Sequence, residues 1–292
     1  MLPSFASAQS PSGLAKAEGL RAYDAKEFGR CAERFLTAVS TAGESKKAEL
    51  LYSAACCQAL EGKPDLALET LERAFEVGLK DGQQVKEDAD FVSVNKTPRF
   101  AALVAKLIER DASFEKATQP KVRDEIQAMV KIDQELRQQA IKNTSHDLVL
   151  QSKLEAVDKK NTKRMKEIVA KYGWPGQTLV GRKAAQGAWL LVQHADRDVA
   201  FQKQMLVLIE AAAKKKDVAP ANVAYLADRI ATAEKRKQVY GTQFGPDLVP
   251  MPIEDEAQVD ERRQSLGLDS MADYAETMKA VYAAQLAPDA GR

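Results

Sequence analysis

Residues 188–196 read AWLLVQHAD, and this stretch decides how the second half of the chain is interpreted. Its first residues are apolar at helical spacing, which predicts a buried helix. The stretch then ends on Gln193, His194 and Asp196, where polar side chains replace apolar ones. Polar residues that break an otherwise consistent pattern are typical of functional sites. We therefore expect a helical domain around this stretch, with a site at the end of the helix.

The composition of the whole chain favours an all-α fold. Of its 292 residues, 45% are hydrophobic and 29% are charged, which is typical of a globular protein. Ala, Leu, Glu, Lys and Gln are abundant and β-branched runs are few, which favours helix. No apolar stretch reaches the length that spans a bilayer. The net charge of +1 gives no long-range attraction to nucleic acid or anionic membranes, so neither is an expected partner.

We expect four segments along the chain. Residues 1–12 resemble the remnant of a signal peptide, because Ala6-Ser7-Ala8 has the small-residue spacing of a cleavage site; the alternative is a disordered tail. Residues 13–110 form a repeat domain, residues 111–121 a polar linker, and residues 122–292 a helical domain. A periplasmic or secreted location follows from the first interpretation, and a cytoplasmic one from the alternative.

The repeat domain contains two copies of one pattern. Small, small, large and small residues recur at the same offsets, as Gly19, Cys31, Phe35 and Ala38, then as Ala55, Ala67, Leu71 and Ala74. Small residues allow two antiparallel helices to approach, and the large residue fills the groove between them. This pattern resembles the tetratricopeptide repeat, a helix-turn-helix unit of about 34 residues. The resemblance implies a concave helical surface that binds a peptide or protein partner through residues 13–110.

The three cysteines, Cys31, Cys56 and Cys57, are too few for a disulfide framework. We expect them to be small buried residues on packed helices. If the protein is exported, Cys31 and one member of the doublet could bridge adjacent helices.

Several signatures follow in order along the second half of the chain. They are a Trp-Pro turn at 174–175, the WLLVQHAD helix end, an AYLADR helix at 224–229, a YGTQ turn at 240–243, and a tail with PIED at 252–255, VDERR at 259–263 and Gly267-Leu268. Together these motifs resemble a bacterial domain family of unknown function. The resemblance implies a shared site over about residues 120–285 but lends no established reaction.

The candidate catalytic residues are His194, Asp196 and Asp228. Histidine gains and loses a proton near neutral pH, and the carboxylate of Asp196 could fix its tautomer. Candidate ligand contacts include Arg229, whose guanidinium is a forked clamp for anions. The other candidates are a set of aromatic, hydroxyl and amide side chains, Trp189, Gln193, Tyr240, Thr242 and Gln243. We expect these groups to converge on one chamber that holds a small carboxylate- or amide-bearing ligand.

Each of these residues also has a structural interpretation. His194 can cap its own helix, because a histidine near a helix C-terminus meets the dipole favourably. Asp228 and Arg229 point about 100° apart on a helix. The YGTQ segment can be a tight turn, and Trp174 and Trp189 can be core residues.

Two functions remain open, and whether the protein is an enzyme stays undecided. The first is a binding or scaffold protein of the exported bacterial repertoire. The second is a metal-independent hydrolase or transferase with His194 as general base. We expect no metal or cofactor, because His146 and His194 have no neighbouring cysteine, and the sequence lacks a nucleophile elbow, a phosphate loop and a dinucleotide fingerprint. Cys56 and Cys57 lie far from both histidines in sequence, which disfavours a Cys–His nucleophile.

Overall fold

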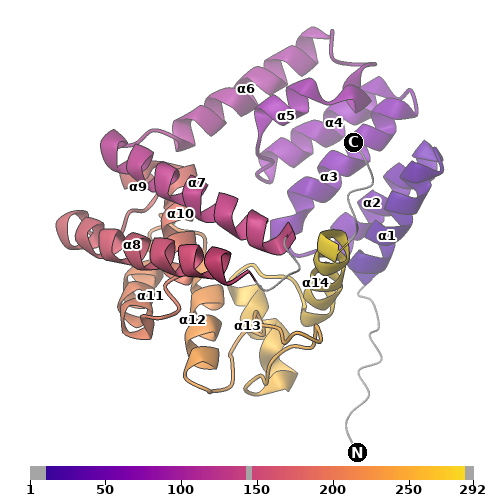
Figure 1. The fold of residues 1–292 in the computed structure, drawn as a ribbon. Coiled ribbons are helices and arrows are strands. Elements are labelled where there is room, and N and C mark those ends of the chain that lie inside the picture. Colours follow the sequence, from indigo (N-terminus) through magenta and orange to yellow (C-terminus); the bar gives the residue numbers. More distant parts are fainter. Residues whose placement is uncertain (1–10, 143–146, 287–292) are drawn as a thin grey trace, which may run out of the picture. The chain divides into compact units, whose positions relative to one another are not determined.

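The computed structural model describes residues 11–142 and 147–286, and these fold into α-helices joined by short loops (Figure 1). The predicted all-α class is confirmed. Within the described ranges, β pairing is limited to two isolated bridges, Gln238 with Ile253 and Phe244 with Pro250. The predicted signal remnant up to residue 10, and His146, lie outside the described residues. None of the described helices has both the length and the apolar character needed to cross a bilayer.

The chain divides into two compact units. The first unit comprises Met1–Ser113 and Arg263–Met278, and the second comprises Phe114–Arg262 and Lys279–Arg292. Helix α6 runs to Phe114 and α7 begins at Pro120, so only residues 115–119 of the predicted linker lie between helices.

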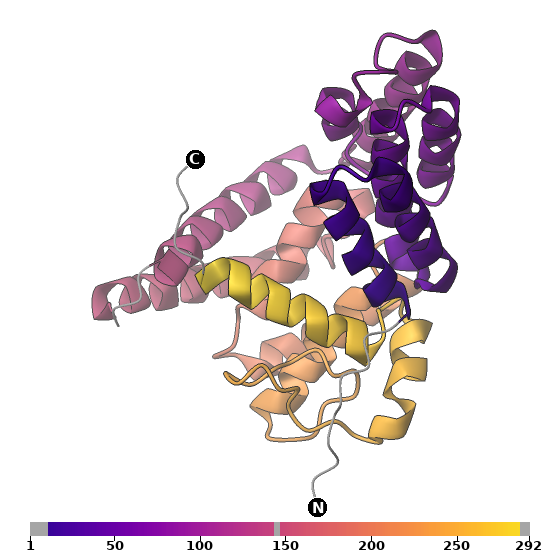
Figure 2. The same ribbon diagram turned by 90° about the vertical axis from the view of Figure 1, so that its right-hand side faces the viewer.

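The N-terminal part of the first unit is formed by consecutive helices that pack side by side (Figure 1, Figure 2). They are α1 (Pro11–Asp24), α2 (Phe28–Thr41), α3 (Glu44–Leu60), α4 (Pro64–Glu76), α5 (Gly82–Glu87), the 3-10 turn η1 (Ala89–Phe91) and α6 (Pro98–Phe114). The repeated pattern explains their packing. Gly19 faces the Phe35 ring so closely that a Cβ there would lie 3.1 Å from it. Phe35 and Leu71, the large residues of the two copies, are both buried.

A disulfide joins Cys31 of α2 to Cys57 of α3, with 5.9 Å between the Cα atoms. All three cysteines are buried, as expected for small residues on packed helices. The bridge also agrees with the alternative prediction, in which Cys31 pairs with either Cys56 or Cys57. Cys56 keeps a free thiol.

The second unit is arranged around α10 (Arg182–Gln193), which packs against α7, α8, α9, α11 and α12. Those neighbours are α7 (Pro120–Lys142), α8 (Leu148–Tyr172), α9 (Gln177–Val180), α11 (Val199–Lys214) and α12 (Ala221–Ala233). Small residues bring α10 close to α7, since a Cβ on Gly187 would lie 2.7 Å from the Val130 side chain. The central position explains why α10 is apolar on most of its surface.

The remaining elements are η2 (Glu256–Gln258), α13 (Val259–Ser265) and α14 (Met271–Leu286). Local chemistry sets the ends of the long helix α8. The side chain of Asp147 accepts hydrogen bonds from the N–H groups of Val149 and Leu150 at its start. Gly173 follows its last residue with φ of 75°, which glycine adopts without strain.

Candidate functional site

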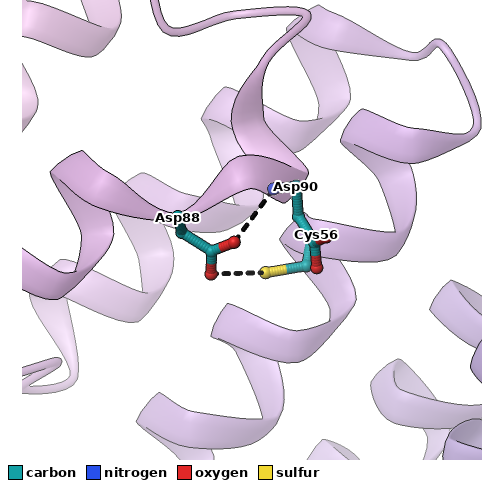
Figure 3. A group of neighbouring side chains, drawn as sticks. All are labelled: Cys56, Asp88 and Asp90. Atoms are coloured by element: carbon teal, nitrogen blue, oxygen red, sulfur yellow. Dashed lines mark hydrogen bonds between the residues drawn. The ribbon is translucent and has the colours of Figure 1, made fainter. Parts of the chain in front are cut away.

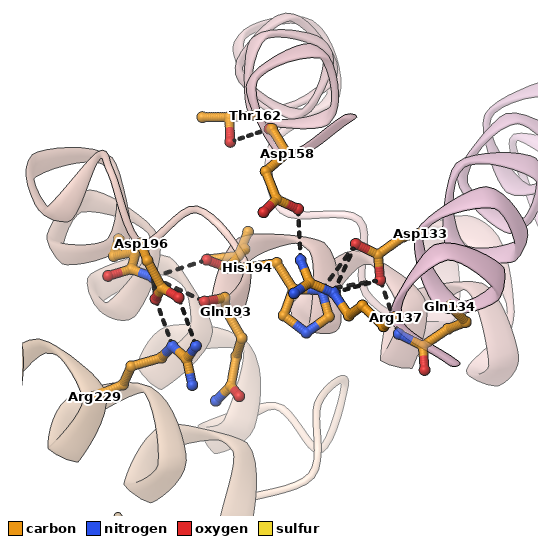
Figure 4. Close-up of polar contacts among 11 residues, drawn as sticks. Asp133, Gln134, Arg137, Asp158, Thr162, Gln193, His194, Asp196 and Arg229 are labelled. Carbon is orange, nitrogen blue, oxygen red and sulfur yellow. Dashed lines mark hydrogen bonds and ion pairs between the residues drawn. The ribbon is translucent and has the colours of Figure 1, made fainter. Parts of the chain in front are cut away.

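His194 occupies the C-cap of α10, where its backbone N–H donates to the carbonyl oxygen of Leu190. Its imidazole reaches across to α7 (Figure 4). Nδ1 lies 3.0 Å from Oδ1 and 2.9 Å from Oδ2 of Asp133. The Asp133 side chain is fully buried, and that of His194 is 14% exposed. The side-chain partner of His194 is therefore a buried carboxylate of another helix.

Asp133 is held in its anionic form. Burial alone would raise its pKa, but the hydrogen bond and charge of His194, with contributions from Gln134 and Arg137, outweigh burial and lower it. Arg137 Nε lies 3.2 Å from Oδ1, and Gln134 Nε2 donates to Oδ2 at 2.8 Å. A carboxylate that is ionised and fixed in place favours a proton on Nδ1 of the facing imidazole.

Arg137 links this pair to α8. Its Nη2 donates to Oδ1 of Asp158 at 2.5 Å. Burial raises the pKa of Asp158, against the effect of Arg137. Single donor atoms of Asp133, Asp158 and His194 lie within 4.8 Å of one another, which is a spacing that could hold a metal ion. The Arg137 guanidinium contacts the carboxylates of both Asp133 and Asp158, so a cationic side chain already balances their negative charge.

Two buried amides near this group have donors without partners. Gln193 Nε2 and Asn161 Nδ2 make no hydrogen bond within the described part of the chain. Gln193 directly precedes His194, but Figure 4 shows that its amide points toward Arg229, whereas the His194 ring is directed to Asp133. Asn161 lies three residues after Asp158, on the same face of α8. A buried donor without an acceptor costs about 1–3 kcal/mol, so each amide is suited to an oxygen acceptor of a ligand.

Asp196 belongs to a second group. Its carboxylate forms a bidentate pair with Arg229 of α12, at 2.6 Å from both Nε and Nη2 (Figure 4). Asp196 is 56% exposed. Gln202 Nε2 donates to the carbonyl oxygens of Val192 and Gln193, which secures the end of α10. The partner of His194 is thus Asp133, whereas Asp196 ties this end of α10 to α12.

Asp228 belongs to a third group and is fully buried. Its carboxylate accepts hydrogen bonds from the backbone N–H groups of Val239 at 2.7 Å, Tyr240 at 3.0 Å and Thr242 at 2.9 Å. Gly241 lies inside this turn with φ of 69°, which glycine adopts readily. The carboxylate therefore shapes the turn at 240–243, and its charged oxygens are directed to backbone donors.

The side chains around this turn are also engaged locally. Gln243 Nε2 donates to Thr242 Oγ1 at 3.0 Å. Burial, followed by the charge of Asp228, raises the pKa of Tyr240, so its phenol stays neutral. Trp189 is a core residue whose Nε1 donates to the Asn222 carbonyl at 3.1 Å and whose ring packs edge-on against Tyr225.

The structure thus distributes the predicted residues over three hydrogen-bonded groups: His194 with Asp133, Asp196 with Arg229, and Asp228 with the turn. Sequence analysis missed Asp133, Arg137 and Asp158. A signal for Asp133 was present, because it follows Met129 by four residues and Val130 by three on the apolar face of α7. An acidic residue at such a position contradicts the pattern, as Asn161 does on α8.

The fold and this site define an all-helical protein with a buried carboxylate–imidazole pair. Residues 120–287 match the family of unknown function DUF6624, and the chain belongs to this family. The matched range includes all three hydrogen-bonded groups. No curated protein and no solved structure matches the chain.

Proposed function

We propose that the second unit is a metal-independent acid–base catalyst, a hydrolase or transferase in which His194 is the general base. The observation that carries the proposal is the fully buried Asp133 carboxylate at 2.9–3.0 Å from Nδ1. In the proposed state, Nδ1–H donates a hydrogen bond to the Asp133 carboxylate, which leaves Nε2 as the basic nitrogen. Nε2 can then take a proton from a water or hydroxyl as this attacks the substrate, and return it to the leaving group.

The two buried amide donors without partners among the described residues, on Gln193 and Asn161, support a substrate with an oxygen acceptor, such as a carboxylate or amide. Gln193 Nε2 is buried and without a partner in the described chain, so a substrate oxygen would satisfy it. In this proposal Asp196 and Asp228 are positioning residues. Asp196, paired with Arg229, secures the segment after His194, and Asp228 holds the turn that carries Tyr240, Thr242 and Gln243.

A second function is favoured by the first unit. Its side-by-side helices and buried repeat residues support a tetratricopeptide-like module that binds a peptide or protein partner. The disulfide between Cys31 and Cys57 supports a periplasmic or secreted location, where oxidising conditions maintain such bonds. A cytoplasmic location is the alternative, and fully reduced cysteines in protein isolated from its native cells would favour it.

The catalytic proposal is tested with His194→Ala and His194→Gln in the full chain. The probes are panels of p-nitrophenyl esters, aminoacyl p-nitroanilides and N-acyl amino acids. We expect turnover in the wild type, and a loss of about 10³-fold or more in both variants, with melting temperatures within a few degrees of the wild type. A large stability loss with unchanged turnover would assign His194 to the core.

A second measurement needs no substrate. Nitrogen-15 NMR of the His194 ring reports which nitrogen carries the proton. We expect the proton on Nδ1 in the neutral ring, because the anionic Asp133 accepts it. If the proton were mainly on Nε2, this nitrogen could not act as the base, and the proposed mechanism would be wrong.

A further inference from the structure

The first unit contains a groove beside α6 that lies outside the His194 site, and its base is the edge of the core that the repeat helices share with α6. Its volume is about 490 Å³. The floor is apolar and formed by one face of α6, with Phe100, Ala101, Val104, Ala105 and Ile108. The rim is polar and formed by Lys86 of α5 and by Asn95 and Lys96 of the turn before α6.

The packing of α5 on α6 builds this groove. Gly82 at the start of α5 lies against α6, where a Cβ would come 2.7 Å from the Ile108 backbone nitrogen. The close approach fixes α5, which carries Lys86, beside the floor (Figure 1). Lys96 lies two residues before Pro98, the first residue of α6. The positive end of the α6 dipole is therefore at the same end as Lys96.

The charges of the groove have one sign. Lys86 and Lys96 are both exposed, and neither forms an ion pair with another described residue. Acidic side chains are not among the described residues that line the groove. A cationic rim above an apolar floor is complementary to a segment that presents apolar side chains next to carboxylates.

We propose that this groove binds an acidic amphipathic peptide segment of a partner protein. Apolar side chains of the segment pack on the half-buried Ile108 and the exposed Ala101 and Ala105, and its Asp or Glu side chains pair with Lys86 and Lys96. Ala101 and Ala105 are four residues apart on α6, and their small side chains allow the backbone of the segment to approach closely. The groove lies wholly in the first unit, so this binding does not depend on the activity of His194.

The test is a selection from a random dodecapeptide display library on the full-length protein, followed by affinity measurements on the enriched peptides. We expect enriched peptides to combine apolar residues with Asp or Glu and to lose about tenfold or more in affinity for the double variant Lys86→Glu/Lys96→Glu. Ala101→Arg, an exposed substitution that fills the groove, should also abolish binding. The matched control is Lys80→Glu/Lys106→Glu, which reverses two lysines of the first unit that do not line the groove and should leave affinity unchanged.

Raising the salt concentration from 50 to 500 mM should weaken binding to the wild type and affect the double variant little, because the lysines are solvent-exposed. Three outcomes would overturn the proposal. They are the absence of any enriched peptide, enrichment of basic or uncharged peptides, and equal binding by wild type and the groove variants when all remain folded by circular dichroism.

Discussion

The two units each bury a cluster of ionisable side chains, and the clusters differ in one respect. In the first unit, the Asp88 carboxylate accepts a hydrogen bond from Tyr52 and lies 3.8 Å from the Cys56 sulfur, while Asp90 lies beside it (Figure 3). In the second unit, Asp133 faces His194 and Arg137. The first cluster joins acids to neutral donors, whereas the second joins acids to groups that carry or accept positive charge.

This difference is reflected in the pKa values of the donors in the first cluster. Burial, reinforced by the charges of Asp88 and Asp90, raises the pKa of the Cys56 thiol, and burial with the hydrogen bond to Asp88 raises the pKa of Tyr52. Burial and the hydrogen bond to Asp90 raise the pKa of Tyr23 to about 12. All three donors therefore stay protonated at neutral pH. The burial of the two clusters is similar, so the cationic partner of Asp133 is the feature on which the catalytic proposal for the second cluster rests.

The largest expected effect comes from removing the anion that orients the imidazole. Asp133→Asn keeps the size of the side chain but loses its charge, so we expect kcat on the best probe substrate to fall by about 10³- to 10⁴-fold. KM should change little, because Asp133 does not contact substrate. Steady-state kinetics measure both constants, and Asp133→Glu serves as the conservative variant that should recover part of kcat. An Asn variant with wild-type kcat would show that the pair has no catalytic role.

The second effect separates Asp228 from Asp196, two acids that sequence analysis treated alike. Asp228→Ala should cost about 3 kcal/mol of unfolding free energy, because three backbone N–H groups lose a buried charged acceptor. Asp196→Ala should cost about 1 kcal/mol or less, because its pair with Arg229 is exposed to solvent. Urea denaturation measures both. Equal losses would show that the two carboxylates have the same structural importance.

The sequence predicted the helical class, which the structure confirms, and it singled out His194 as a candidate site residue, but it did not predict the residues that surround His194. Helix and repeat patterns are local, so the spacing from Gly19 to Ala38 was sufficient to predict paired helices. The partner of His194 lies 61 residues earlier, on a different helix. Without coordinates, Asp196 was the nearest acid in the chain, and nothing local revealed that α12 would bind it through Arg229.

The site residues that could be predicted from sequence were polar residues at positions where the helical pattern predicts an apolar one. Asn161 contradicts the apolar face of α8, and Asp133 contradicts that of α7 in the same way. Arg137 and Asp158 gave no such signal, because a partly exposed charged residue on a long helix matches the ordinary amphipathic pattern. Long-range ion pairs of this kind become visible only when the packing of the helices is known.

A smaller effect concerns the free thiol of the first cluster. Because its pKa is raised, native Cys56 should react with iodoacetamide at pH 8 far more slowly than the same thiol in urea. Cys56→Ala should cost about 1 kcal/mol of unfolding free energy and leave probe-substrate turnover unchanged. Mass spectrometry of alkylated protein measures the reaction. Rapid alkylation of the native protein would show that Cys56 is a reactive thiol. The donors of the first cluster would then not all stay protonated at neutral pH, and the contrast with the second cluster would be lost.

The smallest effects are in the pH dependence of stability, where Asp133 and Asp158 should act with opposite sign. The folded pKa of Asp133 lies below its ordinary value of 3.8, so its stabilising contribution is complete above that value and is lost as the pH falls through the folded pKa. The folded pKa of Asp158 lies above 3.8, so its contribution is present at low pH and is lost as the pH rises through the folded pKa.

Asp133→Asn should therefore flatten the loss of stability below pH 4, and Asp158→Asn should remove a loss that occurs above pH 4. Both changes are expected to be small, because Arg137 is partly exposed and water screens its charge. Unfolding free energies from urea titrations between pH 2.5 and 6 measure the two slopes, with Asp247→Asn at an exposed loop as the matched control. If the slope of unfolding free energy against pH changed with the same sign in both variants, the two carboxylates would titrate as equivalent members of one acidic cluster. The proposed distinction between Asp133 as a fixed anion and Asp158 as a more readily protonated acid would then be wrong.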